Sequence, residues 1–225
     1  MKYLLSLFLL CSSCFLSFSQ IESKPVLPWR APTGQDRFII ELHNDAFLQM
    51  ADSMEIQLYS PGFDAHIMYD YPFSEKSIFS FAWGYGFSSF NIHHNGSFEE
   101  EETSGNTFFR PLPENYSYRK NKVSVNFVEI PLEFRLRTRG LKQFKMAVGA
   151  KVGYVVNVHT KIVDDGGKRK YYQLPNLLRY RYGLSAKIGV GRFNLSGFYS
   201  LSPLLKEGRG PELVPFTIGL SVVLL

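Results

Sequence analysis

The chain has only two cysteines, Cys11 and Cys14, and both lie within residues 1–19. Residues 1–19 are typical of a secretory signal peptide, with a positive charge, a short apolar core and a cleavage site of small residues before Gln20. A mature chain that starts at Gln20 contains no cysteine, which excludes disulfides, thiol nucleophiles and cysteine metal sites. Lipidation of Cys14 is the alternative, although Cys11 stands where lipoprotein signals usually have an aliphatic residue.

The chain also lacks long apolar runs and any concentration of charge of one sign. No apolar run outside the signal approaches the roughly 18 residues that a membrane-spanning helix needs. The formal net charge of +5 is mild, and the basic residues are spread along the chain. We therefore expect no transmembrane helix, and no nucleic-acid partner, because such a partner requires a concentrated basic face.

Alternation of apolar residues with small or charged residues dominates the remaining chain. Residues 144–158 show it most clearly, with apolar side chains from Phe144 to Val158 at every second position and residues such as Gly149 and Lys151 between them. A period of two indicates a β-strand with two unlike faces. This strand is long enough to cross a bilayer at a tilt, which takes about 9–11 residues.

The same alternation recurs after a polar, proline-bearing segment at residues 20–36. Strands are predicted at residues 37–43, 57–70, 78–91, 120–137, 144–158, 179–191, 193–201 and 215–225. Long connections (44–56, 92–119, 161–176 and 203–213) alternate with short ones (71–77, 138–142 and 191–193). Long loops at one end and tight turns at the other are typical of outer-membrane barrels. The apolar parity of residues 120–137 switches near Phe127, which predicts a bulge or the membrane boundary.

The two faces of these strands differ too much in volume for a soluble barrel of the lipocalin type. An eight-stranded barrel has an interior that side chains only just fill, so the row of glycine, alanine and serine fits inside and the aromatic row does not. We therefore predict an all-β fold, an eight-stranded antiparallel up-and-down transmembrane β-barrel at residues 37–225. The residues expected to face lipid include Phe79, Phe81, Trp83, Tyr85, Val148, Val152, Ile188, Ile218 and Leu220.

The inward row is charged as well as small. Both signs occur in comparable number, and charges in a narrow interior must be paired or hydrogen-bonded. A network that closes the barrel is the main interpretation, and a polar path for ions or small solutes is the alternative. The predicted polar network of the lumen consists of Glu41, Asp64, His66, Asp70, Glu129, Glu133, Arg135, Arg137, Lys145, Lys151, Arg179, Arg181 and Lys187.

Candidates for chemistry are few. His66 shares a face with Asp64 and Asp70, as a general base with an orienting carboxylate would, but no nucleophile-elbow serine motif accompanies it. The pair at residues 93–94 is not expected to bind a metal, because adjacent residues on a strand point apart. The acidic run at residues 99–102 is interpreted as a solvated loop tip, with a divalent-cation or basic-partner site as the alternative. No catalytic residue, cofactor or metal site is predicted.

Several segments resemble a known family, the small outer-membrane β-barrel proteins of Gram-negative envelopes that include the PorT-like group. The resemblance runs from Arg37 to Leu225. Its most family-like segments are Tyr69–Pro72, Phe87–Asn91, Glu129–Glu133, Ala147–Tyr154, Tyr199–Leu204, Gly210–Glu212 and Pro215–Leu220.

The resemblance implies a barrel inserted by the outer-membrane assembly machinery. The last strand is similar to the signal that this machinery recognises, through Thr217, Gly219, Val222 and Leu224, and departs from it in ending on leucine instead of an aromatic residue. PorT itself is linked to protein secretion across the outer membrane.

The resulting hypothesis is a non-enzymatic protein of the outer membrane with a structural or interaction role, accessory to protein secretion or envelope assembly. A narrow pore for ions or small solutes is the first alternative, and a lipid-modifying outer-membrane enzyme is the second. The expected partners are outer-membrane lipid, the assembly machinery and proteins of secretion or of the envelope.

Overall fold

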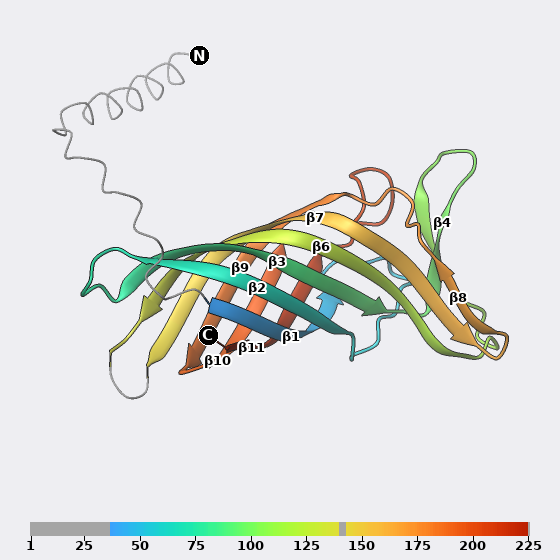
Figure 1. Ribbon diagram of the computed structural model, residues 1–225. Coiled ribbons are helices and arrows are strands. Elements are labelled where there is room, and N and C mark those ends of the chain that lie inside the picture. The colour runs from blue at the N-terminus through green and yellow to red at the C-terminus, as the bar shows by residue number, and fades with distance from the viewer. Residues whose placement is uncertain (1–36, 140–142, 225) are drawn as a thin grey trace, which may run out of the picture. The chain divides into compact units, whose positions relative to one another are not determined.

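The computed structural model describes residues 37–139 and 143–224, which form an all-β structure (Figure 1). The predicted signal peptide and the segment at residues 20–36 lie outside this described part. Within it, no helix is long and apolar enough to cross a membrane.

Eleven strands alternate with turns along the described chain. Their bounds are β1 (Arg37–Phe47), β2 (Pro61–Pro72), β3 (Phe79–His93), β4 (Gly96–Glu100), β5 (Thr107–Pro111), β6 (Tyr118–Arg137), β7 (Phe144–Asp164), β8 (Gly167–Tyr171), β9 (Tyr180–Val190), β10 (Phe193–Ser200) and β11 (Pro215–Val223).

Eight of these strands close a barrel. Each pairs antiparallel with its neighbours in the order β6-β3-β2-β1-β11-β10-β9-β7, and an additional β6–β7 pairing completes the circle. The connectivity is up-and-down, because barrel strands that are consecutive in the sequence are neighbours in the barrel. The predicted eight-stranded antiparallel barrel is therefore confirmed.

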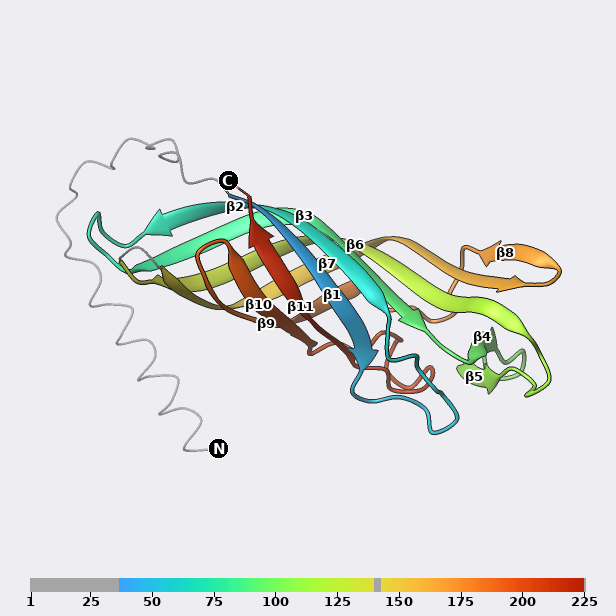
Figure 2. The ribbon, with the colours of Figure 1, turned by 90° about the horizontal axis from the view of Figure 1, so that it is seen from below.

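The structure departs from the predicted strands on the side of the long connections. β2 begins at Pro61, later than expected, and β7 continues to Asp164. We call the end of the barrel at the long connections its outer end. The connection after β3 contains the β4–β5 hairpin, and β8 pairs with the outer end of β7. β8 is exposed at every position, so it lacks the apolar alternation by which barrel strands are recognised. The β4–β5 hairpin packs Phe98 and Phe109 against the apolar cluster, but each of its strands has only five residues. In both Figure 1 and Figure 2 the outer ends of β6 and β7, together with β8, project away from β9–β11.

The parity switch near Phe127 lies beside a bulge on the neighbouring strand β7, but its cause is a change in the interior of the barrel. The pairing register of β6 and β7 shifts between Asn126 and Phe127, whose partners are Asn157 and Val155, so Val156 is the extra residue of a bulge on β7. β6 itself keeps its alternation. Its inward positions change from charged residues such as Glu129 to apolar ones beyond Phe127, because the interior changes in character there.

Large apolar side chains cover the outside of the barrel. Val148 is 57% exposed, Leu220 is 63% exposed and Trp83 is 37% exposed. On the same strands the inward residues Lys151, Ser221 and Ala82 are buried. All the residues predicted to face lipid lie at these outward positions; Phe81 among them is partly covered by Phe134, with ring centroids 5.4 Å apart.

The apolar core of the molecule lies inside the barrel at the end of the long connections. Phe90, Ile92, Val123 and Val125 are fully buried, and with Phe127 they belong to one hydrophobic cluster that also draws residues from the outer connections. Fully burying an aliphatic or aromatic side chain contributes about 1.5–3 kcal/mol. This end of the interior is therefore filled by a stable apolar cluster.

Because Val148 faces outward within the part of β7 that pairs with β9 in the barrel wall, we expect the Val148→Arg substitution to lower the free energy of unfolding by about 2–4 kcal/mol in phospholipid vesicles. The matched control is Tyr171→Arg, which places the same charge on exposed β8 beyond the barrel and should change the value by less than about 0.5 kcal/mol. Denaturant titration measures both. Equal effects of the two substitutions would contradict an outward, lipid-facing Val148.

Candidate functional site

The charged interior between β1, β2, β6, β7 and β9 is the candidate functional site. Alternation directs every second side chain of these strands inward, so acidic residues from β1, β2 and β6 meet basic residues from β7 and β9. Glu41, Asp64, His66, Glu129 and Lys151 are each at most 4% exposed. Such charges are retained in an interior only when they are paired.

Glu129 is the centre of this network. One carboxylate oxygen lies 2.7 Å from Nε2 of His66, and the other accepts a 2.7 Å bond from the guanidinium of Arg181. Nζ of Lys151 is 3.4 Å from Glu129 and donates a 2.8 Å bond to Asp64. Glu129 therefore links β6 to β2, β7 and β9.

Two residues that were not predicted as members extend the network toward the outer end. Both ring nitrogens of His43 face carboxylates, Nδ1 at 2.7 Å from Asp45 and Nε2 at 3.0 Å from Asp64. Asp45 also accepts a 2.7 Å bond from the backbone N–H of Asn91. The predicted first strand ended at His43, so Asp45 fell in a presumed loop. The inward polar positions continue at every second residue from Glu41 through His43 to Asp45, and this alternation would have identified Asp45.

Arginines and lysines gather at the tight-turn end. Asp70 pairs with Arg37 at 3.0 Å, Arg135 at 2.9 Å and Arg137 at 3.0 Å. Glu133 pairs with Arg135 at 2.7 Å and Lys187 at 3.0 Å.

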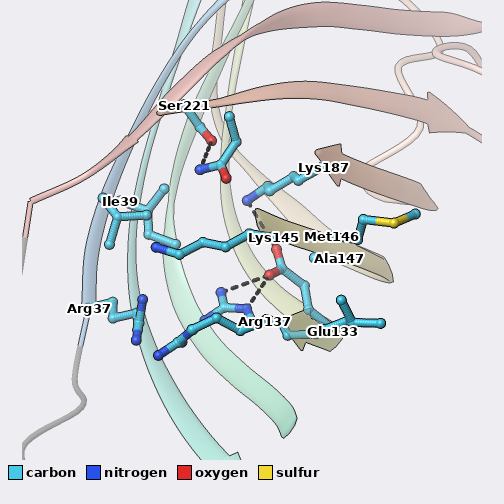
Figure 3. A pocket seen from close by; sticks show the side chains of 13 residues that line it. Arg37, Ile39, Glu133, Arg137, Lys145, Met146, Ala147, Lys187 and Ser221 are labelled. Carbon is cyan, nitrogen blue, oxygen red and sulfur yellow. Dashed lines mark hydrogen bonds and ion pairs between the residues drawn. The ribbon is translucent and has the colours of Figure 1, made fainter. Parts of the chain in front are cut away.

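A cavity of about 40 Å³ opens among these groups, with Arg37, Arg137, Lys145 and Lys187 around the same space as Glu133 (Figure 3). A volume of this size holds a few water molecules at most. The arrangement therefore leaves little room for a solute.

Aromatic rings close the interior above the charged network. The guanidinium of Arg181 lies over the ring of Phe127 at 3.8 Å from its centroid and near that of Phe198 at 5.0 Å. Cations attract the faces of aromatic rings, and more strongly where water is excluded. Arg181 thus joins the charged half of the interior to the apolar cluster beyond it.

The structure brings together all the predicted lumen residues except Arg179. Arg179 is exposed and precedes β9, so its inclusion was wrong: the alternation was extended one residue beyond the point where the strand begins. Lys145 lines the cavity at the tight-turn end and donates to the carbonyl of Gly191.

The alternative role of His66 as a base oriented by Asp64 or Asp70 does not match the geometry. His66 bonds to Glu129 instead, and Asp70 is held by arginines. Glu41, Asp64 and His66 bring ligand atoms within 4.8 Å of one another, as a metal site would. Nζ of Lys151 lies 2.8 Å from Asp64 and 4.0 Å from Glu41, so an ammonium already supplies positive charge at this point.

The two adjacent histidines lie outside the ionic network. His93 ends β3, and His94 is 1% exposed, with its ring packed edge-on against Phe98 and Phe109. Nδ1 of His94 accepts a bond from the backbone N–H of Gly96. Burial lowers the pKa of His94 from 6.5 to about 4, so the ring is neutral near pH 7.

The acidic run at residues 99–102 lies at the β4–β5 hairpin. Glu99 on β4 pairs with Arg110 on β5 at 3.3 Å, and both side chains are largely exposed. Exposed ion pairs of this kind contribute little to stability.

Because Lys151 neutralises several buried carboxylates, we expect Lys151→Met to lower the free energy of unfolding by about 3–5 kcal/mol. The matched control, Arg110→Met, breaks the exposed pair with Glu99 and should cost at most about 1 kcal/mol. Adding Asp64→Asn to Lys151→Met should recover part of the loss, because it removes one uncompensated carboxylate. A loss no larger than that of the control would show that Lys151 is not held in the network.

The low pKa of His94 predicts a pH dependence of stability. Below pH 6.5 the unfolded chain takes up a proton that the folded protein does not bind until about pH 4. Stability therefore falls as pH falls through this window, by at most about 3 kcal/mol. We expect the difference in unfolding free energy between the wild type and His94→Asn to decrease from pH 7 to pH 4. Parallel pH profiles would contradict a buried, neutral His94.

Residues 40–206 match the family model described as the outer membrane protein beta-barrel domain. No curated protein matches the sequence. Among solved structures, the chain is similar to Ail, the attachment invasion locus protein of Yersinia pestis, with 14% identity over 84% of this chain and 97% of that chain and a TM-score of 0.34. A second structure of Ail, in complex with the heparin analogue sucrose octasulfate, has 13% identity, the same coverages and a TM-score of 0.29.

The family match begins in β1 and ends beyond β10, so it spans most of the closed barrel. The exposed apolar exterior and the paired charges inside fit a barrel that is surrounded by lipid. The chain belongs to the family of outer-membrane proteins with a beta-barrel domain.

Proposed function

We propose that this barrel is a closed anchor in the outer membrane, with a structural or interaction role rather than a transport or enzymatic one. The observation that carries the proposal is the filling of its interior. Paired charges occupy the half at the tight turns, and the cluster around Phe90 and Val125 occupies the other half. An interior filled in this way supports anchoring and leaves the outer connections as the functional part.

The geometry favours this role over the two alternatives. A narrow pore would need a polar path through the apolar cluster, where Phe90, Ile92 and Val123 are fully buried. A lipid-modifying enzyme would need a base that reaches substrate, whereas His66 is 1% exposed and bonded to Glu129.

An accessory role in protein secretion or envelope assembly is the finer part of the proposal. Its support is the resemblance of segments such as Ala147–Tyr154 and Pro215–Leu220 to the PorT-like group. We further propose export by a cleaved signal at residues 1–19 and insertion by the outer-membrane assembly machinery. The pattern for insertion begins in β11, where Thr217 faces inward, and continues to exposed Leu224 just after the strand.

A closed interior predicts that the purified protein gives no stepwise conductance in planar lipid bilayers. Lys151 and Arg181 are held by carboxylates, and the apolar cluster blocks the outer half, so no continuous water-filled path is expected. Reproducible single-channel steps would favour the pore and contradict the anchor.

Crosslinking in cell envelopes tests the interaction role. A photoreactive residue placed at exposed Arg110 on the outer hairpin, or at exposed Phe73 in the β2–β3 turn, should capture envelope or secretion proteins. The same group at Val148 faces lipid and is the matched control. Protein adducts at Arg110 or Phe73 but not at Val148 support the proposal, and lipid adducts alone at all three positions contradict it.

A further inference from the structure

Lysines line up across the three strands that project at the outer end of the barrel. Lys122 on β6 is directly opposite Lys161 on β7, and Lys161 is directly opposite Lys170 on β8. In the next row, Lys120 and Lys168 flank Val163. Directly paired residues of antiparallel strands share a face, so Lys120, Lys122, Lys161, Lys168 and Lys170 form one surface, which we name the lysine face.

Among the described residues, no acidic residue stands at the paired positions of the lysine face, and the acid that acts on Lys122 is Asp45, which is buried inside the barrel. None of its lysines forms a salt bridge with another residue of the described chain, and Lys122 donates its one side-chain bond to Asn91 at 2.6 Å. The carboxylate of Asp164 binds Arg169 and Tyr116 instead. Asp164 and Arg169 alternate with the lysines of their strands and therefore lie on the opposite side of the ribbon.

The positive charges of these lysines repel one another, which lowers the pKa of two of them. Burial, together with Lys120, Lys161 and Lys170, lowers the pKa of Lys122 from 10.5 to about 8. Desolvation, together with Lys168, Lys120 and Lys170, also lowers the pKa of Lys161. Like charges directly opposite each other on a sheet are destabilising. A surface that keeps this arrangement is suited to an anionic ligand that would neutralise it.

The lysine face continues the lipid-facing surface of the barrel. β6 keeps one alternation from Lys120 to Leu136, so Lys120 and Lys122 point to the same side as the exposed residues Val128 and Ile130. Lys122 is about 20 Å along the strand from Val128. At a strand tilt of about 40° this is roughly 15 Å along the membrane normal. The lysines thus stand above the hydrocarbon layer, at the level of lipid headgroups.

We propose that the lysine face binds the phosphate groups of an anionic glycolipid in the outer leaflet of the outer membrane. The shared face, the lack of carboxylates and the continuity with the lipid-facing surface together select this ligand. A soluble polyanion would also bind lysines, but its binding would not require the lysines to lie directly beyond the lipid-facing surface of the barrel. Phosphate oxygens would accept bonds from several lysine ammonium groups at once.

The test is titration of the purified full chain in detergent with lipid A that carries two phosphates, followed by native mass spectrometry. The variant K161Q/K168Q/K170Q removes three charges from the projecting ribbon. Since each lysine near an anionic surface contributes roughly fivefold to binding, we expect the retention of this lipid to fall by about 100-fold. The wild type should also prefer bisphosphorylated over dephosphorylated lipid A.

Two control variants separate the site from general charge and from folding. R110Q/K206Q/R209Q removes the same charge from other outer positions and should bind like the wild type. K161R/K168R/K170R keeps the charge and should retain binding. Heat-dependent migration on gels verifies that each barrel is folded.

Equal retention by K161Q/K168Q/K170Q and R110Q/K206Q/R209Q would overturn the proposal. Equal binding of bisphosphorylated and dephosphorylated lipid A by the wild type would also overturn it. If K161Q/K168Q/K170Q lost dextran sulfate binding but retained lipid A like the wild type, the ligand would be a soluble polyanion and the proposal would be overturned. If the wild type bound tripolyphosphate but gave no lipid adduct, the ligand would be free phosphate, which would also overturn the proposal.

Discussion

The pairing of buried charges across strands is the interaction on which this barrel depends. Glu129 receives contacts from His66, Lys151 and Arg181, which belong to three different strands. A charge left alone in such an interior costs several kcal/mol, whereas a paired charge with good hydrogen bonds is tolerated. The network therefore ties the barrel strands to one another in a defined register. If one strand shifted by one residue, all of its inward charges would point into lipid.

The interior is divided along its axis, and this division bears on function. Ion pairs fill the part near the tight turns, and rings and aliphatic side chains such as Phe90 and Val125 fill the part near the long connections. Arg181 contacts both, through Glu129 on one side and Phe127 on the other. A barrel filled by two different kinds of packing is a stable support, and the exposed lysines lie on the strands that project beyond it.

The outward face of the barrel also changes in character along its axis, from apolar to basic. On β6 it is apolar from Val128 to Leu136, and it becomes basic at Lys122 and Lys120. A bilayer has this sequence of environments, with hydrocarbon followed by charged headgroups. One strand thus meets three environments: it supplies Glu129 to the interior, an apolar row to lipid and lysines to the surface above.

The sequence by itself determined that eight strands alternate and which of their faces is bulky and apolar, because side chains alternate locally along any β-strand. It also indicated nearly all the inward charges. Where strands end and which residues pair are not local properties, so Arg179 was wrongly included and Asp45 was missed. Only the tertiary structure decided that Glu129 is the centre of the network, and that lysines separate in the sequence form one face. Both follow from strand register, which is set by packing between distant segments.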